Sequence, residues 1–319
     1  MMMKRLMAAL LAAVCSLASA QAPSQLAIKP ALKVGYAASA AILGSAQAGS
    51  RLVAVGDHGV VLLSDDQGAH WRQAQTVPVR SMLTAVSFAD AKRGWAVGHW
   101  GVVLATSDGG ENWALQRSDL ETDRPLFSVQ ALDAEHVVAV GLWSLVLTSS
   151  DAGKNWQEQA LDVPAGAKRA DLNLFSLFTD AQGRLFAAAE RGMLLRSDDR
   201  GQHWTYLASG YKGSFWTGAS PAPGVLIAAG LRGSIYRSAD DGKTWHRIES
   251  GSTASITAAL LLKDEGVELL GLDGLRLQSH DRGETFTAAS RKDRAELTTG
   301  LALADGRELL FSRSGVVRD

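Results

Sequence analysis

The stretch Ser64-Asp65-Asp66-Gln67-Gly68-Ala69-His70-Trp71 recurs through the chain in recognisable form. Six copies fit the pattern Ser/Thr-x-Asp-x-Gly-x-x-Trp/Phe, and successive aspartates are 42, 43, 48, 41 and 41 residues apart. A period near forty, with apolar runs between the copies, is typical of a propeller blade of four short strands. The aspartate and aromatic residue of each copy are Asp66 and Trp71, Asp108 and Trp113, Asp151 and Trp156, Asp199 and Trp204, Asp240 and Trp245, and Asp281 and Phe286.

A second repeat runs in phase with the first. An apolar strand, a tight turn and another strand precede each octet, as in R-L-V-A-V-G-D-H-G-V-V-L-L-S at 51–64. A seventh such hairpin, R-E-L-L-F-S-R-S-G-V-V-R-D, ends the chain without an octet or an outer strand. The sequence therefore predicts an all-β, seven-bladed β-propeller. We expect the segment L-A-I-K-P-A-L-K-V-G-Y, 26–36, to supply the missing strand of the last blade and so cover its open edge.

The octet itself is predicted to be architectural. In the turn between the third and fourth strands, the aspartate accepts backbone N–H groups, the hydroxyl caps the turn, and the glycine adopts a positive φ. The aromatic residue then fills the space between neighbouring sheets. A catalytic site is needed once, whereas a turn of the fold is needed in each blade, so six copies argue against catalysis by these residues.

The N-terminus has the features of a signal peptide, with Lys4 and Arg5 before a short apolar run and Ala18-Ser19-Ala20 after it. We expect a signal peptide over 1–20, a linker over 21–30 and a single propeller over 31–319. Loss of Lys4 and Arg5 would change the formal charge from −1 to −3, which gives no reason to expect nucleic-acid binding. The only cysteine, Cys15, would leave with the leader, so no disulfide is expected. No metal or cofactor site is expected either.

In a propeller, one face carries the turns between strands two and three together with the crossovers between blades. We expect this face to bind partners, with basic side chains forming a broken ring around the channel and tryptophans serving as interface anchors. The alternatives are ordinary solvated charge, because acidic residues share these crossovers, and tryptophans that plug the channel. The candidates are Arg80, Arg124, Arg169, Arg191, Lys212, Arg232, Arg294, Arg313, Trp100, Trp143 and Trp216.

The repeat resembles the BNR or Asp-box repeat, and the layout over about 31–319 resembles the photosystem II stability/assembly factor-like propellers. That resemblance implies a non-enzymatic, exported, monomeric binding protein that helps to assemble or stabilise a membrane complex. The partner would be an integral membrane protein or an envelope complex. The compartment would be the periplasm, or the thylakoid lumen in a photosynthetic host.

Two other functions are carried forward. A sialidase-like glycosidase shares the Asp-box but requires an Arg-Ile-Pro motif, which the sequence lacks; a carboxylate pair for hydrolysis would have to come from Asp57, Glu190 and Asp273. The third hypothesis is a propeller that binds a carbohydrate or another small ligand on its tryptophans.

Overall fold

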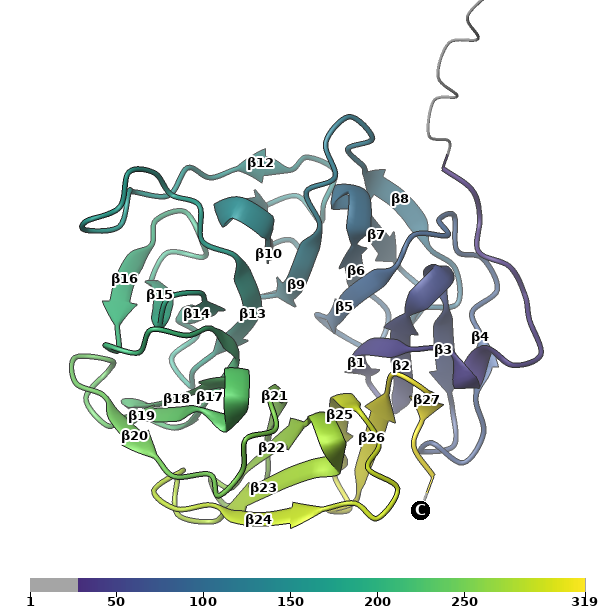
Figure 1. Ribbon diagram of the computed structural model, residues 1–319. Coiled ribbons are helices and arrows are strands. Elements are labelled where there is room, and N and C mark those ends of the chain that lie inside the picture. The colour runs from purple at the N-terminus through teal and green to yellow at the C-terminus, as the bar shows by residue number, and fades with distance from the viewer. Residues whose placement is uncertain (1–27, 319) are drawn as a thin grey trace, which may run out of the picture.

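The computed structural model describes residues 28–318, which form seven antiparallel sheets around a central axis (Figure 1). Six sheets have four strands, and the last has three. The predicted seven-bladed propeller is thus confirmed. The expected signal peptide and most of the expected linker lie outside the described residues.

The blades follow one another along the chain, and each runs from an inner strand to an outer one. Blades 1 and 2 comprise β1 Ile42–Ala48, β2 Arg51–Gly56, β3 Val61–Ser64, β4 Arg72–Gln73, β5 Leu83–Phe88, β6 Gly94–Gly98, β7 Val103–Thr106 and β8 Ala114–Arg117. Blades 3 and 4 comprise β9 Leu126–Ala131, β10 Val137–Gly141, β11 Val146–Ser149, β12 Gln157–Glu158, β13 Leu174–Thr179, β14 Leu185–Ala189, β15 Met193–Ser197 and β16 Thr205–Ala208.

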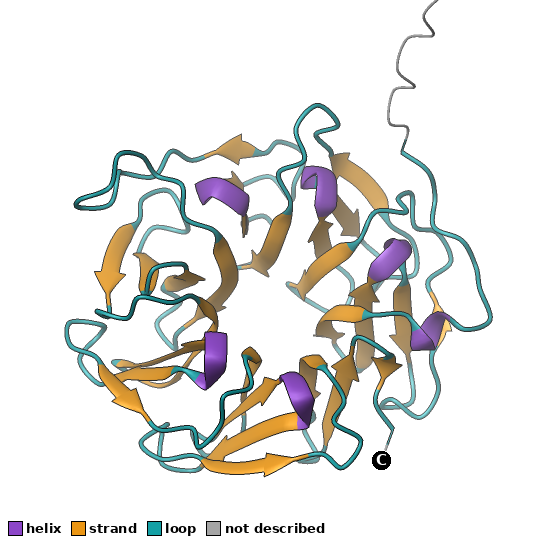
Figure 2. Cartoon of the chain, viewed as in Figure 1, coloured by secondary structure: helices purple, strands orange, loops and turns teal. Residues whose placement is uncertain are grey.

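The remaining blades continue the pattern. Blades 5 and 6 comprise β17 Phe215–Ala222, β18 Val225–Gly230, β19 Ile235–Ser238, β20 His246–Ile248, β21 Ile256–Leu261, β22 Val267–Gly271, β23 Leu275–Ser279 and β24 Thr287–Ser290. Blade 7 comprises β25 Leu297–Ala302, β26 Glu308–Ser312 and β27 Gly315–Val316. Five single-turn 3-10 helices form hairpin tips around the ring (Figure 2): η2 Asp57–Gly59, η3 His99–Gly101, η4 Leu142–Ser144, η5 Leu231–Gly233 and η6 Leu272–Gly274.

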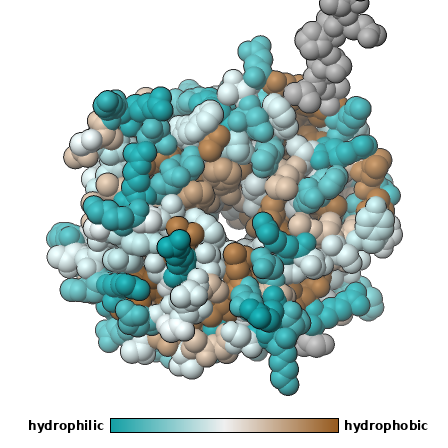
Figure 3. All heavy atoms as spheres, in the orientation of Figure 1, coloured by the Kyte–Doolittle hydropathy of each residue, from teal (hydrophilic) through white to brown (hydrophobic). Residues whose placement is uncertain are grey.

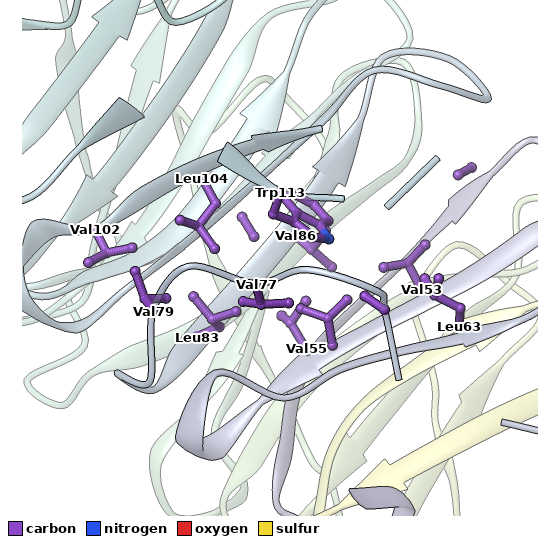
Figure 4. Packing of buried hydrophobic residues seen from close by; sticks show 14 residues of the cluster. Val53, Val55, Leu63, Val77, Val79, Leu83, Val86, Val102, Leu104 and Trp113 are labelled. Atoms are coloured by element: carbon purple, nitrogen blue, oxygen red, sulfur yellow. The ribbon is translucent and has the colours of Figure 1, made fainter. Parts of the chain in front are cut away.

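The core lies between neighbouring blades, because each sheet buries both faces against the next. Between blades 1 and 2, Val53 and Leu63 of one sheet meet Leu104 and Trp113 of the other, with Val86 among them (Figure 4). All five side chains are at least nine-tenths buried. This explains the near-continuous apolar strands of the sequence, since a strand covered on both faces does not alternate in polarity.

Blade 2 shows what the octet does. The Thr106 hydroxyl donates to Asp108 (2.9 Å) and accepts the N–H of Gly110 (3.0 Å). Asp108 in turn accepts the N–H of Asn112 at 2.9 Å. The indole N–H of Trp113 donates to the Gly110 carbonyl at 2.8 Å, so the buried ring has its polar atom satisfied.

The closure of the ring differs from the expectation. No residue between 28 and 41 belongs to a strand, so the last blade keeps three strands rather than receiving a fourth from 26–36. Instead, the N-terminal segment lies beside the outer strand of blade 1 and the loop that follows it. Ala31 donates its N–H to Val77 O (3.0 Å), and Val34 donates its N–H to the Gln73 side chain (2.8 Å). Pro30 has no N–H to give to a strand ladder, which disfavours the expected pairing.

The ring closes through contacts between the faces of blades 7 and 1. The hydroxyls of Ser45 and Thr299 lie 3.0 Å apart, and Gln47 donates to Ala302 O at 3.0 Å. Trp71 of the first octet packs edge-on against Phe311, with ring centroids 5.5 Å apart. A single helical turn, η1 Ala37–Ser39, lies against β27, where its backbone approaches Gly315.

Candidate functional site

One face of the propeller carries all the turns between strands two and three, together with the crossovers between blades; we call it the tip face. The two features are joined by hydrogen bonds, because the first tip residue donates its N–H to the carbonyl just before the inner strand. Asp57 donates to Ala41 O (2.9 Å), His99 to Met82 O (3.0 Å) and Leu272 to Ser255 O (2.9 Å). The octet turns lie at the opposite strand ends, on the side we call the box face.

The turns between strands two and three, which form the tips of the blades, have the same backbone conformation but carry different side chains. The second tip residue has a positive φ in blades 1 to 6. The octet turns show the same feature, as at Gln67 and Arg200, so this geometry belongs to the fold and is not strain reserved for a site. What varies is the side chain presented, and these residues are His58, Trp100, Trp143, Arg191, Arg232 and Asp273.

The basic candidates divide into paired and unpaired groups. Arg124 makes two 2.8 Å bonds to Glu158, which raise the pKa of the guanidinium above its usual value. Arg169 and Arg191 share Asp171, at 3.0 and 3.3 Å. Arg294 donates a 2.6 Å hydrogen bond to the Asp273 carboxylate. The guanidinium of Arg313 forms a long ion pair with Glu296, at 3.9 Å between nitrogen and oxygen.

Three basic candidates have no carboxylate partner within the described residues: Arg80, Lys212 and Arg232. All three side chains are exposed, and the bond recorded for the Arg80 guanidinium goes to the Pro30 carbonyl at 3.3 Å. The structure therefore places the eight residues on one face but neutralises many of them locally. Whether they bind a partner stays a prediction.

The three tryptophan candidates lie in different surroundings. Trp143 is 56 % exposed at the tip of blade 3, where its backbone N–H is held by Asn173. Trp100 is half-buried and packs against the core between blades 1 and 2. Trp216 lines the central channel. Trp143 is thus exposed at a tip, Trp100 packs against the core, and Trp216 lines the channel.

A collar at the channel mouth was missed by sequence reasoning. In each blade the pairing of the inner and second strands shifts register at the second residue of the inner strand. Such bulges redirect a side chain, and here they line a channel of about 450 Å³, whose opening is visible at the centre of the tip face (Figure 3). The collar residues are Leu43, Thr84, Phe127, Phe175, Trp216, Thr257 and Thr298.

The collar has two unlike halves. Thr84 and Thr257 donate their hydroxyls to Leu126 O (2.6 Å) and Leu297 O (2.8 Å), so these residues join one blade to the next. Blades 3, 4 and 5 instead carry consecutive aromatic residues, and the first two rings, Phe127 and Phe175, stack at 5.7 Å. The aromatic residues are visible in the sequence as L-F-S at 126–128, L-F-S at 174–176 and F-W-T at 215–217, at the start of three successive inner strands.

The carboxylates considered for hydrolysis do not form a pair. Asp57 binds its neighbour His58 at 2.9 Å, Glu190 binds Asn173, and Asp273 binds Arg294. They belong to the tips of blades 1, 4 and 6, which are not adjacent. The Arg294 guanidinium lowers the pKa of Asp273, the opposite of what a general acid needs.

Across residues 28–318, no group of three or more His, Cys, Asp and Glu side chains is arranged to hold a metal ion. In the same part of the chain, no helix has the length and apolar character needed to cross a membrane.

Comparison with known proteins agrees with the geometry. The family model described as Photosynthesis system II assembly factor YCF48 matches residues 63–215. No curated protein matches the chain. Among solved structures, "YCF48 bound to D1 peptide" superposes with a TM-score of 0.73 at 20% identity, covering 91% of this chain and 98% of that one.

A second structure, "YCF48 from Cyanidioschyzon merolae", gives a TM-score of 0.70 at 18% identity, over 89% of this chain and 97% of that one. At 20% and 18% identity these two structures are evidence for the fold alone. The match to the family model is evidence from the sequence of residues 63–215. Residues 63–215 thus match the photosystem II assembly factor family by sequence, and the chain shares its propeller fold with the two YCF48 structures.

Proposed function

We propose that this chain is a non-enzymatic binding protein that holds a segment of a membrane-protein client on its tip face during assembly of a complex. The observation that carries the proposal is the composition of that face. The exposed Trp143 lies on this face, and three aromatic residues line the channel mouth: Phe127, Phe175 and Trp216. The face also carries three cations with no carboxylate partner among the described residues: Arg80, Lys212 and Arg232. Aromatic residues and arginine are the side chains that dominate binding energy in protein interfaces.

The comparisons support the same proposal. One propeller of the same fold was solved with a D1 peptide bound, so the architecture is able to accommodate a peptide from another protein. A leader-like N-terminus supports export, which would place the chain in the periplasm, or in the thylakoid lumen of a photosynthetic host. We propose that it acts there as a monomer.

The test is crosslinking in intact cells followed by purification of the tagged chain and identification of attached membrane proteins. Reversing Arg80, Lys212 and Arg232 together to glutamate should reduce client recovery about 10-fold or more, since charge complementarity guides such encounters. The matched control reverses three exposed lysines of the box face, Lys92, Lys154 and Lys243, and so changes net charge equally. Equal recovery with both triple variants would contradict the proposal.

One observation favours a second candidate, the binding of a small ring-shaped ligand such as a sugar. Phe127, Phe175 and Trp216 face a channel of about 450 Å³ beside hydroxyl groups, and aromatic faces with adjacent polar groups suit such ligands. Calorimetric titration with soluble oligosaccharides, repeated on Phe127→Ala, tests it. Heat release that the substitution abolishes would favour this candidate.

A further inference from the structure

A separate pocket of about 230 Å³ opens on the tip face beside blades 1 and 2. It shares no lining residue with the central channel. Five distinct parts of the chain build it: the N-terminal segment, the tip of blade 1, the tip of blade 2, the crossover between these blades, and the crossover from blade 2 to blade 3. Its lining residues are Ile28, Lys29, His58, Val79, Arg80, Ser81, Trp100, Val102 and Leu120.

The inside of this pocket is apolar. Val79 and Val102, each 1% exposed, form part of the core beneath it, and the half-buried Trp100 lies beside them. Ile28 and Leu120, at 36% and 37% exposure, line it nearer to solvent. Five apolar side chains around so small a volume make a hole suited to one large side chain, since a lipid chain would require a longer tunnel.

The N-terminal wall is held in place by hydrogen bonds. Ala31 and Val34 are fixed to blade 1 as described above, and Gln73 also donates to Leu32 O at 3.0 Å. Arg80 bonds the Pro30 carbonyl, which ties the wall to the crossover that forms the opposite side. The segment predicted to close blade 7 thus shapes a pocket beside blade 1.

The rim of the pocket is cationic. Lys29 and Arg80 are exposed, and neither has a carboxylate within ion-pair distance among residues 28–318. No carboxylate lines the pocket.

The nearby acids are engaged elsewhere. Asp57 pairs with His58, and Asp123 accepts the Trp100 N–H at 2.8 Å. Asp119 accepts the N–H groups of its own loop, from Glu121 and Thr122. An incoming carboxylate would therefore meet two cations without displacing an internal carboxylate.

We propose that this pocket receives a large aliphatic or aromatic side chain from an extended segment of a protein partner, while Arg80 and Lys29 bind a carboxylate next to that side chain. The inference rests on the proposed protein-binding function and gives it a partner chemistry. The carboxylate belongs either to an Asp or Glu neighbour or to the free C-terminus of the segment. The planar guanidinium of arginine donates two hydrogen bonds to a carboxylate of either origin.

The test uses the full chain and a random heptapeptide display library, in one format with free C-termini and one with amidated C-termini. Enriched peptides should carry a large apolar residue within two positions of Asp, Glu or a free C-terminus. Affinity for the best peptide, measured by fluorescence anisotropy, should fall about 10-fold or more with Leu120→Asp and with the double change Lys29→Glu/Arg80→Glu, the loss expected on removing an interface anchor.

Matched controls keep the test specific. Leu115→Asp alters a leucine of nearly equal exposure, 36%, on an outer strand. Lys92→Glu/Lys154→Glu reverses two exposed charges on the box face. Both controls should leave affinity within about twofold of the parent chain, which also shows that a charge change alone is not responsible.

Several results would overturn the proposal. Peptides that bind both pocket variants normally would place the site elsewhere. If Lys212→Glu/Arg232→Glu abolished binding of the enriched peptides, the tip face would still be a protein-binding surface, and only the proposal that the pocket is the binding site would be refuted. A dimer that Leu120→Asp dissociates would identify a second copy as the occupant. Failure to enrich any peptide would also overturn the pocket, while client crosslinking decides the proposed function independently.

Discussion

Asp240 is the residue around which the octet turn of blade 5 is built. Its two carboxylate oxygens accept the Ser238 hydroxyl (2.8 Å), the Thr244 N–H (2.9 Å) and the Thr244 hydroxyl (2.6 Å). The hydrogen bonds from Thr244, followed by that from Ser238, lower the pKa of Asp240 to about 2. Since these donors favour the ionised form, the charge itself stabilises the turn.

Asp240→Asn should therefore destabilise the protein in a pH-dependent way. A depressed native pKa contributes stability above the ordinary value near 3.8, and this contribution is lost as the pH falls toward about 2. The difference in urea midpoint between parent and variant should be largest above pH 4 and shrink below it. Asp198→Asn, which alters an exposed carboxylate bound to Arg196, is the control. A difference that does not change with pH would contradict the explanation.

The octet tryptophans are not equivalent, which gives a second prediction. In blade 2 the Trp113 indole donates to Gly110 O, whereas the Trp156 indole nitrogen of blade 3 is buried without a partner. Trp113→Phe should cost about 1 kcal/mol more than Trp156→Phe, because only the first substitution leaves a buried carbonyl unpaired. Denaturant unfolding of the two variants measures this. Equal losses would show that ring volume alone matters.

At the scale of the elements, blades 6 and 7 meet through buried charge. Glu268 of β22 is fully buried and accepts a 2.6 Å bond from Arg276 of β23, which also bonds Glu308 of β26. One Glu268 oxygen has no partner. Burial and the neighbouring Glu268 raise the pKa of Glu308 to about 7. Glu308 also lines a pocket of about 810 Å³, which gives protons a route from solvent.

This arrangement predicts that the parent chain loses stability as the pH rises through about 7. A carboxyl group with a raised native pKa stabilises the fold while it is protonated, and the contribution disappears on ionisation. Because a glutamate in the unfolded chain ionises near 4.5, Glu308→Gln should match the parent in melting temperature at pH 4 and exceed it at pH 8.5. Glu249→Gln, at an exposed position, should follow the parent at both values. A constant difference between Glu308→Gln and parent would refute the assignment.

The same elements show how far sequence could predict the structure. The apolar strands and octets located six complete blades, because their periodicity reflects backbone geometry and two-sided burial. In the sequence Glu268 stands inside an otherwise apolar run at 267–271, at the position that Val53 and Trp95 occupy in other blades. Its partner Arg276 lies eight residues away on the next strand, but the bond from Arg276 to Glu308 of blade 7 spans 32 residues, and a contact at that distance leaves no local signal.

The candidate site was predictable in outline and not in detail. The face and its turns follow from strand order, so residues such as Arg232 could be placed there from the repeat. The acidic residues of the crossovers indicated that some cations would be paired, but the partner of Arg124 could not be predicted, because Glu158 comes from an outer strand 34 positions away. The collar bulges were hidden for another reason: the inner strands are partly exposed to the channel and do not alternate regularly in burial, so a one-residue shift of register leaves no visible break in their pattern.

At the scale of the whole molecule, the seam between blades 7 and 1 is the place where the ring depends on non-covalent contact between the chain's two ends. Blade 7 has three strands and blade 1 has its own four, so among the described residues neither terminal blade takes a strand from the other end of the chain. The seam is held by side chains, including the Ser45–Thr299 pair and the Trp71–Phe311 contact. Because β27 is a two-residue edge strand, we expect opening to start at this seam.

A covalent bond across the seam tests that expectation. Ser45 and Thr299 are close enough for Ser45→Cys/Thr299→Cys to form a disulfide, and the chain's only other cysteine is Cys15. Closing a loop of some 250 residues should stabilise the oxidised protein by up to about 5 kcal/mol. Hydrogen exchange at β25–β27 should slow most of all, because these amides would lose their route of local opening. The reduced variant and each single cysteine variant are the controls. If oxidation raised the unfolding midpoint but left exchange at β25–β27 faster than at β13–β15, opening would not begin at the seam.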